Sequence, residues 1–181
     1  MNSKKKLLIL ILAFVLLIGG AAVMYNILSD DADVENLAGT DAGDVVVPDF
    51  TVYDKDMNPV KLSDFRGKPV IVSFWASWCG VCKAEMPDFN AAYEKYGDEV
   101  MFMMINVTDG TQETKESADE FLATVDYTFP IYYDTTLEAG IKYGVSALPT
   151  SFFINSDGGL VGWGNYIDAA TLEQAIGDML K

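Results

Sequence analysis

Apolar runs and amphipathic stretches alternate along residues 45–181, which is typical of a layered α/β domain. Continuous apolar runs bounded by turn signals predict strands buried on both faces at 69–75 and 100–107. Apolar residues at helical spacing predict helices at 79–96, 113–125 and 136–143, and a last helix from its cap at Asp168 to Leu180. We therefore expect a central sheet with helices on its faces.

Two hairpins complete the predicted pattern. Residues 47–53 and 60–62 flank a stretch rich in Asp, Asn and Pro, which predicts an N-terminal hairpin. Residues 151–155 and 160–163 flank the turn Ser156-Asp157-Gly158-Gly159, which predicts a second hairpin near the C-terminus. A short extended piece is expected between them, at 129–133.

Residues 1–28 form a separate apolar region. No charge occurs from Leu7 to Leu28, and a helix of that length spans about 33 Å against a hydrocarbon core of about 30 Å. Lysines precede the run and acidic residues follow it, so the positive-inside rule predicts a single-pass anchor with the rest of the chain outside the cytosol. The alternative is a signal sequence cleaved near Gly20-Ala21-Ala22, which would release the protein. Both interpretations predict an exported domain.

Residues 29–44 are acidic, lack any basic residue and contain few large apolar side chains. This composition predicts a disordered linker before a compact domain at 45–181. Beyond Lys6, 27 acidic residues stand against nine basic ones, a net charge of −18. Such a surface repels phosphate backbones, so we expect no nucleic-acid partner.

Both cysteines of the chain lie in the stretch Trp78-Cys79-Gly80-Val81-Cys82, and the sequence contains no histidine. Tetrahedral zinc needs four Cys, His or carboxylate ligands, so two thiols alone make a poor metal site. A purely structural disulfide is a second possibility, although closing so short a loop removes little entropy from the unfolded chain. The third possibility is a disulfide that opens and closes during catalysis.

The redox interpretation explains more of the pattern. Cys79 falls in the first turn of a predicted helix, where free backbone N–H groups and the helix dipole favour a thiolate. Cys79 would then attack a partner's disulfide without a histidine base, and Cys82 would resolve the mixed disulfide. We expect Cys79 to be exposed and reactive, Cys82 to be protected, and no cofactor beyond the disulfide itself.

The stretch from Phe74 to Pro87 resembles the active-site strand and helix of thioredoxins, including the proline five residues after the second cysteine. Leu148-Pro149-Thr150 resembles the cis-proline loop of that family. The N-terminal hairpin and the long stretch between motif and loop are most similar to the TlpA/ResA-like branch. The resemblance covers residues 45–181 and implies an α/β thioredoxin-like fold: a central mixed β-sheet flanked by helices, with an N-terminal β-hairpin extension and a central insertion.

The same resemblance implies roles for residues around the disulfide. ResA-like proteins carry a glutamate three residues after the second cysteine, and Glu85 matches it as an acid–base partner for Cys82, the alternative being an ordinary solvated helix glutamate. Ser73 stands where thioredoxin has a buried aspartate. The residues expected to contact a substrate are Trp78, Gly80, Val81, Leu148, Pro149 and Thr150.

The resemblance implies a membrane-tethered, extracytoplasmic thiol–disulfide oxidoreductase. The leading hypothesis is a reductase that takes electrons from a membrane thiol donor and passes them to disulfides of exported proteins, such as apocytochrome c or an oxidised reductase. An oxidase that inserts disulfides into secreted proteins is one alternative, and a surface-anchored binding module with an inert disulfide is another. We expect the protein to be a monomer.

Overall fold

The computed structural model describes residues 45–181. The anchor and the linker predicted for residues 1–44 lie outside this range. Of the helices within residues 45–181, none has the length and apolar character needed to cross a bilayer.

A mixed sheet of seven strands organises the domain, in the order β2-β1-β5-β4-β3-β6-β7. The strands are β1 (Thr51–Tyr53), β2 (Pro59–Lys61), β3 (Val70–Trp75), β4 (Met101–Asn106), β5 (Ile131–Tyr133), β6 (Thr150–Ile154) and β7 (Leu160–Gly164). Strand β3 pairs in parallel with β4 and antiparallel with β6, and both predicted hairpins, β1–β2 and β6–β7, are present at the sheet's edges. This arrangement is a thioredoxin-like fold.

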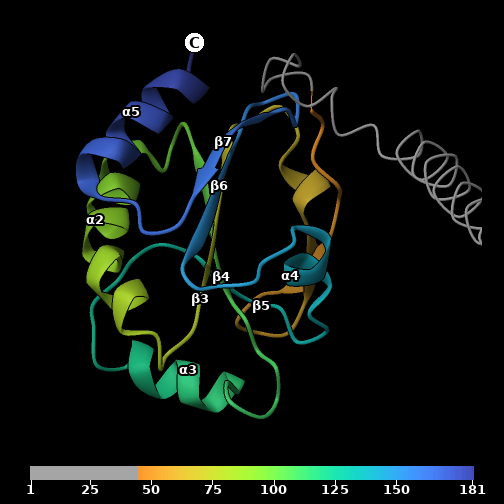
Figure 1. The fold of residues 1–181 in the computed structure, drawn as a ribbon, viewed down its shortest axis with the longest axis vertical. Helices are drawn as coiled ribbons and strands as arrows, with labels where there is room; N and C mark the ends of the chain where they lie inside the picture. The colour runs from red at the N-terminus through yellow and green to blue at the C-terminus, as the bar shows by residue number, and fades with distance from the viewer. Residues whose placement is uncertain (1–44) are drawn as a thin grey trace, which may run out of the picture. The chain divides into compact units, whose positions relative to one another are not determined.

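Helices cover both faces of the sheet. They are the 3-10 helix η3 (Leu62–Phe65) and the α-helices α2 (Gly80–Tyr96), α3 (Lys115–Leu122), α4 (Glu138–Lys142) and α5 (Ala169–Met179). Helices α2 and α5 lie on one face, α4 lies on the other, and α3 lies at the end where β3 and β4 finish (Figure 1). The helix predicted from Glu113 begins two residues later, because Thr114 is its N-cap and accepts a hydrogen bond from the backbone of Ser117.

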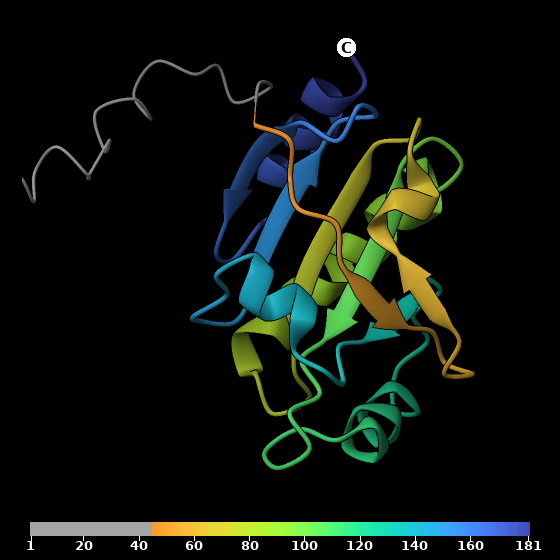
Figure 2. The ribbon, with the colours of Figure 1, turned by 90° about the vertical axis from the view of Figure 1, so that its right-hand side faces the viewer.

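Strand β3 explains the two-layered core. Successive side chains point to opposite faces, so Ile71 and Trp75 join the cluster beneath α2 and α5, while Val72 and Phe74 join the cluster on the other face. The segment after residue 45 crosses that second face (Figure 2) and contributes Val47 to its core. Met103 and Met104 are buried on opposite faces, so the methionines of β4 are core residues, as their place in an apolar run predicts.

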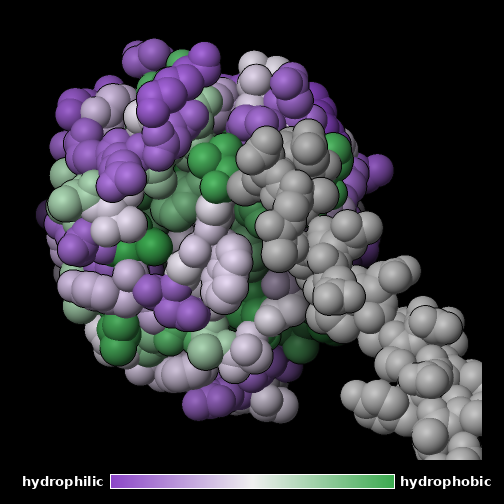
Figure 3. Space-filling view, turned by 45° about the horizontal axis from the view of Figure 1, so that its top comes forward, coloured by the Kyte–Doolittle hydropathy of each residue, from purple (hydrophilic) through white to green (hydrophobic). Residues whose placement is uncertain are grey.

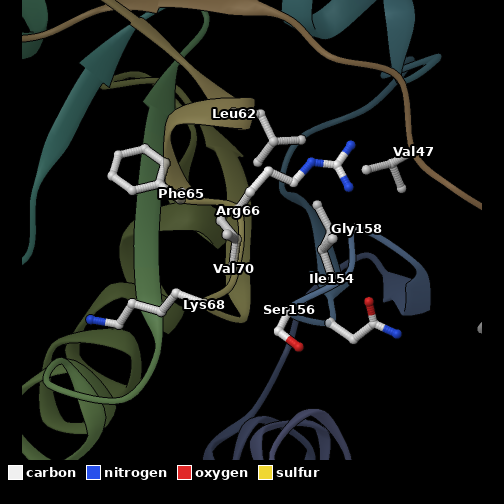
Figure 4. A pocket seen from close by; sticks show the side chains of 10 residues that line it. Val47, Leu62, Phe65, Arg66, Lys68, Val70, Ile154, Ser156 and Gly158 are labelled. Carbon is white, nitrogen blue, oxygen red and sulfur yellow. The ribbon is translucent and has the colours of Figure 1, made fainter.

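A small pocket lies where β3 begins, at the end of the strand away from the cysteines (Figure 4). Its two cations are already bound: Arg66 Nη1 donates to the carbonyl of Asp157, and Lys68 Nζ donates to that of Gly97 at 3.0 Å. The pocket therefore lies at the packing contact between η3 and the β6–β7 turn, and we do not assign it a catalytic or binding role.

The surface of the domain is acidic, with 21 acidic and nine basic residues within 45–181. Hydrophilic residues gather at the edges of the face in Figure 3, and apolar residues form small separate patches between them.

Three carboxylates are not on this surface, because the side chains of Glu85, Glu113 and Asp134 are buried. A buried carboxylate is costly unless it is hydrogen-bonded. Two of these three carboxylates belong to the site described next.

Candidate active site

The turn from β3 into α2 places the two cysteines. Cys79 is the N-cap of α2, and its backbone N–H donates to the carbonyl of Ala76 at 3.1 Å. Its Sγ accepts a hydrogen bond of 3.1 Å from the backbone N–H of Cys82. The two cysteines form a disulfide, with their Cα atoms 5.3 Å apart. The free N–H groups and the dipole of α2 therefore point at the sulfur that would become a thiolate.

The two sulfurs differ less in exposure than the sequence predicted. Cys82 is fully buried, and Cys79 is only 5% exposed. The prediction of an exposed Cys79 is wrong in degree, because this residue packs into the core cluster that contains Trp75 and Ala76. The neighbouring side chains of Trp78 and Val81, each about half exposed, form the open surface of the motif instead.

Glu85 faces the interior one helical turn after Cys82. Its side chain is 2% exposed, so it is not a solvated helix glutamate. Its Oε2 accepts a hydrogen bond of 2.8 Å from the backbone N–H of Ile167. Burial raises the pKa of Glu85 to about 7, the Ile167 hydrogen bond opposes this shift, and the nearby charge of Asp88 adds to it. The carboxyl can therefore give or take a proton near neutral pH.

Ser73 occupies the place where thioredoxin has a buried aspartate. Its side chain is buried and its Oγ accepts a hydrogen bond of 3.0 Å from the Oγ of Ser151, the residue opposite it on β6. This position holds a satisfied, neutral pair. The buried acid of α2 is Glu85, one helical turn after Cys82.

The loop before β6 carries the predicted cis bond, which is confirmed between Leu148 and Pro149. Leu148 packs against the cluster that contains both cysteines. The side chain of Thr150 is buried, donates to the carbonyl of Ala147 at 2.7 Å and accepts from Asn165 at 2.8 Å. Thr150 thus braces the loop through its side chain, so any contact with a substrate falls to its backbone and to its neighbours.

Two residues of the site were not identified from the sequence. Asn165 Nδ2 donates to the carbonyl of Pro149 at 2.7 Å. The buried carboxylate of Glu113 accepts two hydrogen bonds from Ser77, in the turn that precedes the cysteines. Both contacts join residues that are not neighbours in the chain, and no local sequence pattern around Asn165 or Glu113 marks either residue as part of the site.

Comparison with known proteins identifies the family. Residues 44–162 match the model of the AhpC/TSA family. A thiol-disulfide oxidoreductase ResA from Oceanobacillus iheyensis is 34% identical over 161 residues, which cover 87% of this chain and 81% of the relative. The chain belongs to this family, among its ResA-like thiol–disulfide oxidoreductases. The ResA of Bacillus thuringiensis subsp. konkukian is 37% identical over 114 residues, and there the alignment spans 63% of this chain and 64% of the relative.

Solved structures of similar proteins agree with the assignment of this chain to the thiol–disulfide oxidoreductases. A thiol:disulfide interchange protein DsbE from Chlorobium tepidum is similar, with 33% identity, a TM-score of 0.67, and coverage of 75% of this chain and 96% of the other. StoA from Bacillus subtilis is similar as well, with 26% identity, a TM-score of 0.63, and coverage of 72% and 98%. Within residues 45–181, no group of three or more His, Cys, Asp or Glu side chains is arranged to hold a metal ion.

Proposed function

We propose that this oxidoreductase is an extracytoplasmic protein-disulfide reductase in which Cys79 attacks, Cys82 resolves and Glu85 carries a proton. The Cys79 thiolate attacks one sulfur of a substrate disulfide, whose S–S bond breaks, and the leaving thiolate takes a proton. The Cys82 thiolate then attacks Cys79 Sγ, which releases the substrate as a dithiol and leaves the Cys79–Cys82 disulfide. The substrate gains two electrons and two protons, and a thiol donor in the membrane restores the cysteine pair.

The observation that carries this proposal is the buried carboxyl of Glu85 on the same helical face as Cys82. The thiol of Cys82 must lose its proton before it can attack, and Cys82 is fully buried. A carboxyl with a pKa of about 7 is matched to accept that proton at neutral pH.

The proposed direction of electron flow is supported by how few groups, beyond the N-terminus of α2, would stabilise a thiolate at Cys79. Strongly oxidising enzymes of this chemistry owe their potential to a stabilised reduced form. The dipeptide between the cysteines is Gly80-Val81, and the chain has no histidine. The next cation along α2, Lys83, lies over the ring of Phe121 with its Nζ 5.4 Å from the ring centroid. The backbone N–H of Cys82 donates the hydrogen bond that Cys79 Sγ accepts, and this limited support for a thiolate favours a reducing pair.

The proposed location rests on the leader sequence. Leu7 to Leu28 would anchor the protein in the membrane with the domain outside the cytosol, or a signal peptidase would release it. A structurally similar protein from Streptococcus pneumoniae, with 28% identity and a TM-score of 0.65, is described as an exposed lipoprotein thioredoxin. Because the proposed location is outside the cytosol, the proposed partners are disulfide-containing exported proteins. We also propose that the protein is a monomer.

Trapping of mixed disulfides tests the function. A Cys82→Ala variant cannot resolve the intermediate, so in cells it should accumulate disulfide-linked complexes with exported proteins through Cys79. The double variant Cys79→Ser, Cys82→Ala is the matched control and should trap nothing. Equal trapping by both variants, or full function of Cys79→Ser alone, would identify an inert binding module instead.

A further inference from the structure

Glu113 is a buried carboxylate that the proposed reaction does not use. It lies two residues before α3 and its side chain is 1% exposed. Oε1 accepts hydrogen bonds from the backbone N–H of Ser77 at 2.8 Å and from Asn106 Nδ2 at 2.7 Å. Oε2 accepts a third bond, from Ser77 Oγ at 2.8 Å. Three donors thus satisfy one carboxylate at the start of the active-site turn.

The segment that presents Glu113 is itself held in place. Asp109 Oδ1 accepts hydrogen bonds from the backbone N–H groups of residues 111, 112 and 113, at 2.7, 2.7 and 3.0 Å. These backbone donors, of which that of Glu113 contributes most, hold the pKa of Asp109 down to about 2. Asn106, the other partner of Glu113, ends β4 directly beside Trp75 at the end of β3. The backbone of Glu113 is therefore held in place where its side chain binds Ser77.

Ser77 is the link to the chemistry. It lies between Ala76, whose carbonyl accepts the N–H of Cys79, and Trp78, which precedes Cys79. The position of this turn decides whether Cys79 stays at the N-cap, where the N–H of Cys82 reaches its sulfur. The turn sits in a loop whose backbone pairs with no neighbouring strand, so the side chain of Glu113 supplies its main polar anchor.

We propose that Glu113 is a positioning residue for Cys79. By holding Ser77 it keeps the Cys79 sulfur at the N-terminus of α2, where the helix favours the thiolate. The segment between β4 and α3, which carries Glu113, thus sets the reactivity of a thiol more than thirty residues away in the sequence. This inference rests on the proposed function, in which Cys79 is the attacking thiol.

Two substitutions of Glu113 separate geometry from charge. Glu113→Gln keeps a carbonyl oxygen for the N–H of Ser77 and for Asn106, and its amide can donate to Ser77 Oγ, so the anchor survives without the charge. Glu113→Ala removes the anchor. Asp49→Ala is the matched control, because Asp49 holds Ser63 in the same way, through N–H at 2.9 Å and Oγ at 2.8 Å, beside the N-terminal hairpin.

The measurement is the rate at which iodoacetamide labels each cysteine of the reduced, full-length protein at pH 7. We expect Glu113→Ala to slow Cys79 roughly tenfold, as loss of hydrogen bonding and dipole support for a thiolate implies. Glu113→Gln and Asp49→Ala should stay within about twofold of the wild type. Unfolding would speed the labelling of Cys82, so a slower Cys79 beside an unchanged Cys82 reports a displaced turn. Should Glu113→Ala fail to fold, Ser77→Ala carries the test, with an expected slowing of roughly threefold.

Three results would overturn the inference: an unchanged Cys79 in Glu113→Ala or its substitute, an equal slowing in Glu113→Gln, or an equal slowing in Asp49→Ala. The second would assign the effect to charge, and the third to general destabilisation. Failure of the proposed function would give a different result from failure of this inference. In that case iodoacetamide would label Cys79 of the wild-type protein no faster than Cys82.

Discussion

The backbone N–H of Ile167 donates a hydrogen bond of 2.8 Å to Oε2 of Glu85 and so joins the buried face of α2 to the loop before α5. Two residues earlier in that loop, Asn165 holds the carbonyl of Pro149. One short segment therefore fixes both the proposed acid–base group and the loop proposed to receive the substrate. The connection between β7 and α5 therefore sets the position of Glu85 relative to the loop that contains Pro149.

Glu85→Gln should change how thiol reactivity depends on pH. Above pH 7 the ionised Glu85 disfavours a nearby thiolate, so its neutral replacement should lower the apparent pKa of the cysteine pair. General acid–base catalysis contributes about 100-fold or more in many enzymes, so we expect disulfide-reductase turnover at pH 7 to fall by about tenfold or more. Alkylation rates and turnover between pH 5 and 9 measure both effects. Glu94→Gln, an exposed site on the same helix, is the control, and a Glu85→Gln profile that matches it would show that Glu85 carries no proton.

The same carboxyl should make stability depend on pH. Its pKa is about 7 in the folded protein and near 4.5 when unfolded, so the folded state binds the proton more tightly. Stability should therefore fall as pH rises from about 4.5 to about 7, by up to about 3 kcal/mol, and then level off. Urea unfolding of the oxidised protein across this range, compared with Glu85→Gln, isolates the effect. Identical slopes in the two proteins would contradict the raised pKa.

Cys79 should be labelled before Cys82 in the reduced protein. Cys79 is 5% exposed and lies at the helix N-terminus, whereas Cys82 is fully buried. We expect limited alkylation to modify Cys79 at least about tenfold faster, because access and thiolate character both favour it. Peptide mass analysis after partial labelling gives the ratio. Preferential modification of Cys82 would reverse the roles of the two thiols.

Asn165→Ala should weaken substrate binding more than chemistry. The substitution removes the hydrogen bonds to the Pro149 carbonyl and to Thr150 Oγ1 and leaves the cysteines untouched. We expect KM for a protein disulfide to rise roughly threefold to tenfold, while Cys79 alkylation stays unchanged. Asn155→Ala, which removes two hydrogen bonds in the turn at the other end of β6, is the control. A fall in kcat with constant KM would place Asn165 in the chemical step instead.

Local sequence signals were sufficient for the framework of the site. The apolar run of β3 and the predicted helix after it placed Cys79 in a first helical turn, and the spacing from Cys82 to Glu85 placed both on one helical face. These features depend on neighbours within one or two turns, which a single sequence displays directly. The positions of β3 and β4 along the chain also followed from their continuous apolar character.

The missing parts depend on contacts over long sequence separations. Ser77 and Glu113 are 36 residues apart, and Glu85 and Ile167 are 82 residues apart. Nothing in the residues around Glu113 distinguishes a buried carboxylate from a solvated one at a helix start. The near-complete burial of Cys79 was likewise missed, because it depends on packing against Trp75 and not on the position of the cap alone.

The reduction potential of the Cys79–Cys82 pair tests the proposed direction of electron flow most directly. Equilibration of the full-length protein with glutathione or dithiothreitol buffers at pH 7, read out by alkylation of the free thiols, gives this value. We predict a potential below about −200 mV, nearer to thioredoxin than to strongly oxidising enzymes. A potential of about −120 mV would contradict the reductase and identify an oxidase that donates its disulfide to secreted proteins.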